Sequence, residues 1–391
     1  MSKKITLSLL VALTLSANSD TPSLEKRVNL LEKQIQELKL QNVQAKQHLH
    51  SSSFSQNAYL PDIALILNMS SVARNVKNSQ YENFAIDGFI KKGEAELPFN
   101  KNRGFNLNYA ELALHSVVDP YFEAFTMLHL HPDKLEIGEA YVKTTALPYG
   151  LGVKAGKFKS SFGRINAKHQ HAWNFDDQPI IYKAFFGPDA ISDMGISTQW
   201  VADTQNYLMI GVELLQGSNE RSFGDTQKNN LTVGYLKTGV DFTEDLSTLA
   251  GVSFARGKNT FGGDTDIYGA DLTMQQQFDS YSSLTWQSEL LYRKRQNVIT
   301  NAKQAGFYTQ FVYKYNKNYA AGIRYDGIIK KSVKDLNKYT AMVEYHPFPM
   351  SRLRLSYSYD KTKIIDGSRK NIHTVMLTLN IAAGAHGAHD Y

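Results

Sequence analysis

The sequence predicts an all-β transmembrane barrel of about 16 antiparallel strands, preceded by a short periplasmic α-helical coiled coil. Beyond the N-terminus no run of about 18 apolar residues occurs, which excludes a membrane-spanning helix. The 391 residues include 22 tyrosines and 20 phenylalanines but only 10 prolines, a composition that favours β-structure with aromatic girdles. From residue 58 to the C-terminus, apolar and polar residues alternate repeatedly, which is the period of a strand.

The start of the chain predicts a signal peptide, residues 1–19. Lys3 and Lys4 form a positive region, residues 5–15 are apolar but too few to span a bilayer, and residues 17–19 supply small side chains for cleavage. We therefore expect an exported chain. It contains no cysteine, so disulfides and thiolate metal sites are excluded.

Residues 20–47 predict a coiled coil in the periplasm. Apolar residues recur there with alternating spacings of four and three, at Leu24, Val28, Leu31, Ile35 and Leu38, and the seam continues through Asn42 and Ala45. Charged residues flank this narrow seam over about three heptads, which favours self-association. The alternative is a lone amphipathic helix packed on the rest of the chain. Residues 48–57, rich in Ser and Gln, are expected to be a linker.

Residues 58–391 predict the barrel itself. In the segment 352–360 one face carries Leu353, Leu355, Tyr357 and Tyr359, and the other carries Arg352, Arg354, Ser356, Ser358 and Asp360. A water-soluble sandwich would bury the apolar face, but it would not explain arginine and glutamate at mid-strand on the other. A transmembrane barrel explains both faces, with apolar side chains toward lipid and polar ones toward a lumen.

Turn signals predict the number of strands. Short links are expected at 119–120, 148–149, 203–205, 243–245, 279–281, 316–318 and 348–350, and the alternate connections, most of them longer, at 75–104, 131–134, 163–192, 217–229, 257–264, 296–303, 328–337 and 361–370. Seven links and eight connections make fifteen, and fifteen join sixteen strands. An even count with both ends on the periplasmic side is what a bacterial outer-membrane barrel requires.

Charge and motifs argue against other classes. Without Lys3 and Lys4 the chain has 41 basic residues (43 minus 2) and 37 acidic ones, a net charge of about +4, which is too small to predict a nucleic-acid partner. Neither a Gly-x-Ser-x-Gly elbow nor a phosphate-binding glycine loop is present, so we expect no enzyme. The expected partners are outer-membrane lipid, small solutes and further copies of the chain.

A barrel of this size leaves an aqueous channel. The connection 163–192 is among the two longest and is rich in functional side chains. With this layout the chain resembles outer-membrane porins, and it is similar to the phosphate-selective porins of the O/P type and to the coiled-coil-bearing sugar porins. The resemblance implies that the third outer connection folds into the barrel and constricts it, and that trimers form. The candidates for this constriction are Arg164, Lys168, His169, His171, Asp176, Asp177 and Lys183.

A narrower resemblance covers most of the chain. The block His-Gln-His-Ala-Trp-Asn-Phe-Asp-Asp-Gln-Pro at 169–179 and the block at 62–68 are similar to plug-less proteobacterial outer-membrane proteins often labelled zinc-regulated or TonB-dependent. TonB-dependent receptors need about twenty-two strands and a plug, which roughly 330 residues cannot supply. The chain also lacks the unbroken arginine ladder of phosphate-selective porins, which argues against phosphate. We therefore expect passive diffusion.

Strand parity predicts a polarised lumen. The inward side chains form an acidic arc of Glu111, His115, Glu123, His129 and Glu139, and a basic arc of Arg293, Lys314, Arg324, Arg352 and Arg354. Two such arcs would impose a transverse field on solutes, and the basic surplus predicts a weak anion preference. The alternative is that these charges only solvate the inner wall.

The eleven histidines raise a further hypothesis. His129 and His131 share a strand face with Glu123, and two imidazoles with a carboxylate suit zinc. The alternative is that they bind no metal, and no other cofactor is predicted. The sequence thus predicts a weakly selective outer-membrane channel. Two alternatives remain: a zinc-binding or metal-uptake protein, and a closed structural barrel whose coiled coil tethers the envelope.

Overall fold

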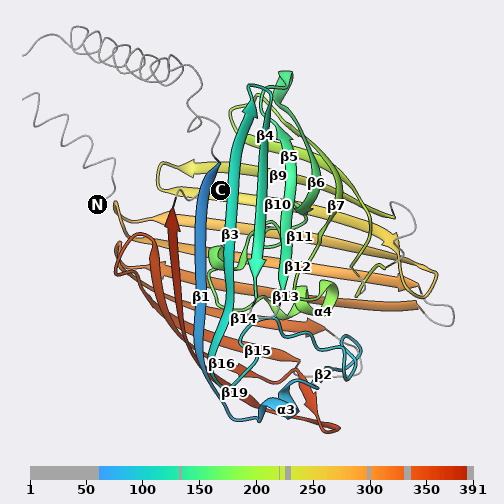
Figure 1. The fold of residues 1–391 in the computed structure, drawn as a ribbon, viewed down its shortest axis with the longest axis vertical. Helices are drawn as coiled ribbons and strands as arrows, with labels where there is room; N and C mark the ends of the chain where they lie inside the picture. The colour runs from blue at the N-terminus through green and yellow to red at the C-terminus, as the bar shows by residue number, and fades with distance from the viewer. Residues whose placement is uncertain are drawn as a thin grey trace, which may run out of the picture. The chain divides into compact units, whose positions relative to one another are not determined.

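Sixteen strands of the described chain close into one antiparallel barrel (Figure 1). The computed structural model describes residues 61–131, 134–219, 221–224, 230–296, 301–329 and 336–384. The predicted signal peptide, coiled coil and linker lie outside these residues. Among the described helices, none has the length and hydropathy needed to cross a membrane.

The wall of the barrel follows the chain order, and β1 closes it by pairing with both β3 and β19. The wall strands are β1 (Asp62–Arg74), β3 (Gly104–Asp119), β4 (Phe122–Leu130), β5 (Leu135–Thr144), β6 (Leu151–Lys159), β7 (Ser192–Val201), β8 (Tyr207–Leu215), β9 (Leu231–Thr243), β10 (Leu246–Lys258), β11 (Asp264–Gln277), β12 (Ser283–Gln296), β13 (Asn301–Lys314), β14 (Tyr319–Ile329), β15 (Asn337–Tyr345), β16 (Ser351–Asp360) and β19 (Ile372–Gly384). The expected strand number is confirmed.

The connections alternate between short turns and longer segments, as the sequence predicts. Between the described strands, seven short turns lie at one end of the barrel, each at a predicted position. The connections at the other end include 75–103, 160–191 and 361–371, which contain secondary structure of their own. These elements are α3 (Asn78–Tyr81), β2 (Ala85–Ile86), η3 (Gln170–Ala172), α4 (Ile180–Phe186), β17 (Lys363–Ile365) and β18 (Ser368–Arg369), while η2 (Pro148–Gly150) lies in a turn.

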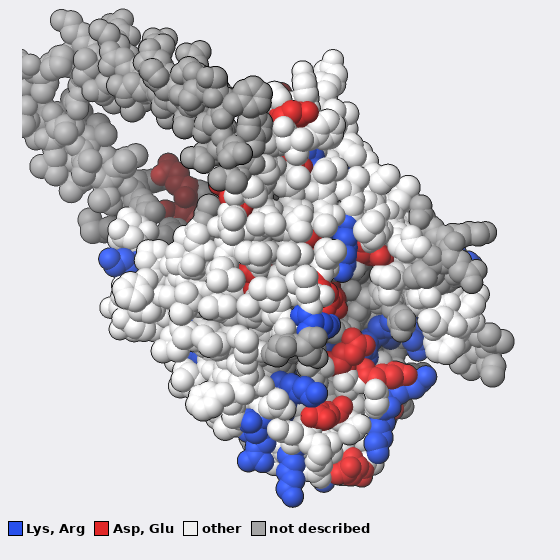
Figure 2. Space-filling model, in the orientation of Figure 1, with Lys and Arg blue, Asp and Glu red and all other residues white. Residues whose placement is uncertain are grey.

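Alternation along each strand decides which side chains face outward. On β16, Leu355 and Tyr357 are 47% and 45% exposed, whereas Arg354 and Ser356 are 1% and 6% exposed. Successive residues of a strand point to opposite faces, so the wall has an apolar outer surface and a polar inner one. Figure 2 shows charged side chains gathered mainly around the end that carries α3 and β2, while much of the strand wall in view is uncharged. Such a wall fits contact with lipid.

The larger apolar core of the described residues lies inside the barrel. Every residue of α4 except Lys183 is buried, and the helix packs against β13 and β14. Wall residues such as Leu215, at the end of β8, and Leu231, at the start of β9, join this core. Phe84 and Ile365 join it from the first and last long connections, which also share the small sheet β18-β17-β2. The strand number predicts an aqueous lumen, but protein fills the lumen at the end that carries the long connections. The filling follows because the apolar helix α4 must be shielded from water.

Candidate functional site: a connection folded into the barrel

The connection between β6 and β7, residues 160–191, folds into the lumen. Its two ends are hydrogen-bonded to each other through Asn166, and we call this point the neck. The Asn166 side chain donates hydrogen bonds to the carbonyl oxygens of Ser160 and Ile191, at 2.8 and 3.0 Å. Its own amide oxygen accepts a hydrogen bond from the Ile191 backbone N–H at 2.8 Å. One buried side chain thus ties the two ends of the connection together, and the residues between them fold against the inner wall. We call this segment the inner loop.

Glu289 on β12 is the main polar anchor of the inner loop. Its carboxylate accepts hydrogen bonds from the backbone amides of Arg164 and Ile165, at 2.9 and 3.0 Å. It also accepts hydrogen bonds from the hydroxyls of Tyr182 and Tyr308, at 2.6 and 2.5 Å. Four donors around one buried carboxylate satisfy its charge without a cation, and they join the start of the inner loop to α4 and to the wall.

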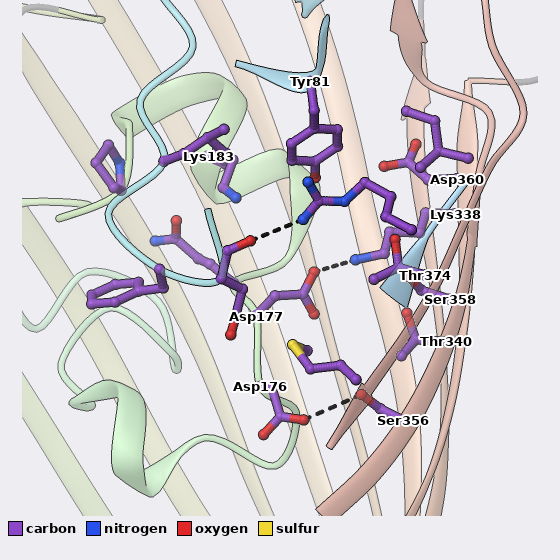
Figure 3. Close-up of a pocket in the computed structure, with 18 of the residues that line it drawn as sticks. Tyr81, Asp176, Asp177, Lys183, Lys338, Thr340, Ser356, Ser358, Asp360 and Thr374 are labelled. Carbon is purple, nitrogen blue, oxygen red and sulfur yellow. Dashed lines mark hydrogen bonds and ion pairs between the residues drawn. The ribbon is translucent and has the colours of Figure 1, made fainter. Parts of the chain in front are cut away.

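Two adjacent aspartates of the inner loop face the basic arc. Asp176 lies 2.9 Å from Arg354 Nη1 on β16, and it accepts a hydrogen bond from Ser356 at 3.2 Å (Figure 3). Asp177 lies 2.7 Å from Arg324 Nη2 on β14 and forms a second ion pair with Lys338 on β15. Three neighbouring strands therefore supply the cations, and one short piece of the inner loop supplies the anions.

The ionisation of Asp177 reflects these partners. Burial raises the pKa of its carboxyl, but the cations of Arg324 and Lys338 outweigh burial and hold that pKa well below its ordinary value. Asp177 is therefore an anion at any physiological pH. Removing it would leave two buried cations with a deficit of negative charge, which is the costly kind of change in a buried ion pair.

Two histidines of the inner loop face the acidic arc. His171 Nδ1 lies 3.2 Å from Glu111 Oε1 on β3, and His169 Nε2 lies 3.0 Å from Glu139 Oε2 on β5. The two imidazole rings are stacked, with centroids 5.8 Å apart. The inner loop is thus chemically matched to both sides of the lumen, because its aspartates meet arginines and its histidines meet glutamates.

The start of α4 is bound to the wall, and its end is bound to the wall and to the connection between β8 and β9. The Ile180 backbone N–H donates to Asp326 Oδ1 at 3.0 Å at the start of the helix. At its end the Phe185 carbonyl accepts from Ser222 Oγ at 2.5 Å, and the guanidinium of Arg293 lies 4.4 Å from the centre of the Phe185 ring. Arg293, predicted to line open water, is fully buried beneath the inner loop.

Other predicted pore-lining residues lie nearer the short turns. His115 and Glu123 contact each other at 3.4 Å, and Lys314 is an exposed residue at the turn end of β13. Arg352 lies 3.7 Å from Glu344 on β15. These residues lie at the end of the barrel away from the apolar core.

The three residues grouped as a zinc site from the sequence are not brought together. His131 lies beside Glu136, at 3.9 Å, and Glu123 is six residues of strand, about 20 Å, from His129. His129 instead lies 3.5 Å from Glu111 on the neighbouring strand. Each histidine therefore contacts a glutamate on a neighbouring strand and not Glu123. Such cross-strand contacts are not revealed by a single sequence.

A polar cavity of about 80 Å³ remains between the inner loop and the wall. The ammonium of Lys183 points into it, opposite side chains of β15, β16 and β19 (Figure 3). Arg74 also lines it, with its guanidinium 3.4 Å from the centre of the Tyr81 ring and 2.9 Å from the Asn100 carbonyl oxygen. Burial lowers the pKa of Lys183. The volume is sufficient for a few water molecules or a small solute group.

The other predicted constriction residues have separate surroundings. Arg164 meets Glu289 through its backbone rather than its guanidinium. Burial, reinforced by the Arg164 cation, lowers the pKa of Lys168 to about 8. Sequence reasoning missed Glu289, Asp326 and Lys338. The sequence does contain a signal for the first two, because each lies on the same strand face as an arginine that is predicted to line the pore. Glu289 is four residues before Arg293, and Asp326 is two residues after Arg324.

The fold is that of an outer-membrane porin barrel. The chain is similar to the anion-selective porin from Comamonas acidovorans, at 11% identity over 83% of this chain and 99% of that chain, with a TM-score of 0.56. It is also similar to the outer-membrane channel DcaP of Acinetobacter baumannii, at 12% identity over 85% and 99% of the two chains, with a TM-score of 0.53. A loop-deletion form of OmpT, an outer-membrane protein of Vibrio cholerae, matches 83% and 100% of the chains at 14% identity and a TM-score of 0.52.

The chain belongs to the same family as an uncharacterized protein of Aquifex aeolicus (strain VF5). The two are 38% identical over 385 residues, which span 87% of this chain and 82% of that protein. No family model matches the chain.

Replacing Asp177 tests the ion pairs that hold the inner loop. We expect Asp177→Asn to lower the free energy of unfolding by about 3 kcal/mol or more, because Lys338 loses its anion and Arg324 keeps only Asp326. Denaturant unfolding of the protein refolded in lipid vesicles measures the change. Asp203→Asn, in the exposed turn between β7 and β8, is the matched control. Equal stability of the two variants would show that these pairs do not anchor the inner loop.

Proposed function

We propose that the protein is an outer-membrane channel for the passive, weakly selective diffusion of small polar or charged solutes, constricted by the inner loop. The observation that carries the proposal is the charge pairing between the inner loop and the lumen wall. Asp176 and Asp177 are held by Arg354, Arg324 and Lys338, so the inner loop narrows the lumen in a fixed position. The polar cavity beside it supports a narrow path along the basic arc.

The charges of this cavity favour anions. Its three aspartates are already paired, Asp176 with Arg354, Asp177 with Arg324 and Lys338, and Asp360 with Lys363. The side-chain ammonium of Lys183 makes no hydrogen bond or ion pair with another described residue, and Arg74 donates to backbone carbonyls rather than to a carboxylate. Two cations therefore lack a paired anion there, and anions would be attracted to them. One structurally similar barrel is described as an anion-selective porin, which agrees with this preference.

The proposal extends to the location and assembly of the chain. Residues 1–19 would direct export, and residues 20–47 would form a coiled coil in the periplasm below a barrel in the outer membrane of a Gram-negative bacterium. We propose a trimer, as in the O/P type of porin that the sequence resembles. Vibrio cholerae OmpT, a barrel with a TM-score of 0.51 to this chain, is described in a trimer form.

A closed structural barrel is the second candidate. The apolar core inside the lumen favours it, because Phe162, Tyr182 and Phe185 of the inner loop are fully buried at the end that carries the long connections. In that case the barrel would pass no current, and the predicted coiled coil would carry the function by binding partners in the periplasm. Planar-bilayer recording distinguishes the two candidates.

Shortening the inner loop tests the constriction. A variant with residues 168–186 replaced by a short Gly/Ser linker keeps the neck at Asn166. We expect its single-channel conductance to rise about twofold or more, because the narrowest part of the path is removed. Wild-type protein refolded in parallel is the reference. Unchanged conductance in a folded variant would place the constriction elsewhere, and the absence of channels from both proteins would favour the structural barrel.

Neutralising Lys183 tests the origin of the anion preference. We expect Lys183→Gln to lower the chloride-to-potassium permeability ratio, measured by the reversal potential in a KCl gradient, because one of the cations facing the cavity is lost. Lys317→Gln makes the same charge change in the exposed turn between β13 and β14 and should leave the ratio unchanged. A ratio that responds to neither substitution, or equally to both, would contradict the assigned path.

A further inference from the structure

A cluster of imidazoles and carboxylates lies where the inner loop meets β3, β4 and β5. Glu111 comes from β3, His129 from β4 and His169 from the inner loop, and one donor atom from each lies within 4.8 Å of the others. Glu111 is 2% exposed and His169 4% exposed, whereas the His129 side chain is 23% exposed, so the group lies within the protein with His129 at its accessible edge. Two paired strands and the inner loop thus point metal-ligating atoms at one place.

We infer that Glu111, His129 and His169 bind one divalent transition-metal ion of the zinc type. Imidazole nitrogen and carboxylate oxygen are the preferred ligands of such ions when no thiolate is available. Ligands of a tetrahedral zinc ion lie about 3.3 Å apart, so small rotations of these side chains would complete the site. Two imidazoles and one carboxylate also leave a position open for water or another ligand.

The surrounding residues support metal ligands rather than isolated ion pairs. Glu139 Oε2 contacts His169 Nε2 at 3.0 Å. With Nδ1 of His169 as the ligand atom, this is the carboxylate–histidine arrangement that orients metal-bound imidazoles. His171 contacts the second carboxylate oxygen of Glu111 at 3.2 Å. Glu139 also accepts a hydrogen bond from the Lys159 backbone N–H at 2.5 Å. Two of the proposed ligands, Glu111 and His169, therefore each have a partner that fixes their orientation.

A local irregularity of the wall makes room for His129. The pairing of β4 with β5 is interrupted by a bulge between Met127 and Leu128, opposite Gly138. A Cβ atom on Gly138 would lie 2.8 Å from Cε1 of the His129 ring, closer than side-chain atoms approach each other. Glycine at the bulge therefore lets the imidazole lie flat against β5 and turn toward the cluster.

The cluster also has an entry path. A cavity of about 350 Å³ is lined by His129 and His169 together with Glu136, Lys157 and Arg221. It lies where β5 and β6 separate, since these strands pair only from Ala140 to Lys143 of β5. An ion could therefore reach the cluster without unfolding of the wall.

The consequence of binding is a cross-link between the inner loop and the wall. His169 belongs to the inner loop, whereas Glu111 and His129 belong to the barrel, so the ion joins the acidic arc to the inner loop. The site lies on the acidic arc, whereas the polar cavity of the proposed channel lies on the basic arc. Metal binding therefore goes beyond the proposed function, and it can be tested whether or not the barrel conducts.

Zinc binding to the full mature chain tests the inference. The chain is refolded in detergent, stripped with a chelator and titrated with Zn²⁺ against a chromophoric competitor, and Co²⁺ is added separately to read the coordination spectrum. We expect one equivalent to bind at the cluster. His129→Ala and His169→Ala should each abolish it, and Glu139→Gln should weaken it by about 10–100-fold through the lost orienting contact.

Matched variants make the result specific. His115→Ala removes a histidine of β3 that contacts Glu123 and Asp62 away from the cluster, and it should leave zinc binding unchanged. Glu111→Gln keeps the size of the side chain and replaces the alanine variants if either fails to refold, as judged by heat-dependent mobility in gels. Absence of tight zinc binding to the wild type would overturn the inference. So would binding that survives His129→Ala, His169→Ala and Glu111→Gln, because the metal would then lie at other histidines.

Discussion

The need to partner buried charges inside the barrel governs the rest of this structure. The inner wall carries arginines on β12, β14 and β16, a lysine on β15 and glutamates on β3 and β5, and a filled lumen removes most of the water that would solvate them. An unpaired buried charge costs several kcal/mol. The inner loop supplies aspartates to the arginines and histidines to the glutamates, and its apolar helix α4 then fills the space between.

The barrel could be predicted because its signals are local. A period of two, read along residues 352–360, assigns faces to Leu355 and Arg354 without knowledge of any other strand, and turn residues mark where each strand ends. The pairs between the inner loop and the wall are not local. Glu111 and His171 are 60 residues apart and meet only because the inner loop folds back into the barrel. The seven-residue α4 is too short for a clear helical period, so the sequence predicts Lys183 as a constriction residue but does not predict the helix that carries it.

The inner loop gives the lumen two unlike sides. Along the basic arc it leaves a polar cavity faced by Lys183, which suits an anion path. Along the acidic arc it brings His169 to Glu111 and His129, which suits a divalent metal ion. The apolar core between these two sides restricts how much the inner loop can move. Conduction and metal binding therefore depend on one shared feature, the position of the inner loop against the wall.

Hydrogen–deuterium exchange of the refolded protein tests that position most directly. The backbone amides of Arg164, Ile165 and Ile180 donate to Glu289 and Asp326, so they are predicted to exchange as slowly as the amides of the wall strands β13 and β14. The exposed turn between β17 and β18, at Asp366 and Gly367, gives the rate of an outer loop in the same protein. Exchange of the inner-loop amides at that fast rate would contradict a loop held inside the barrel by the wall charges.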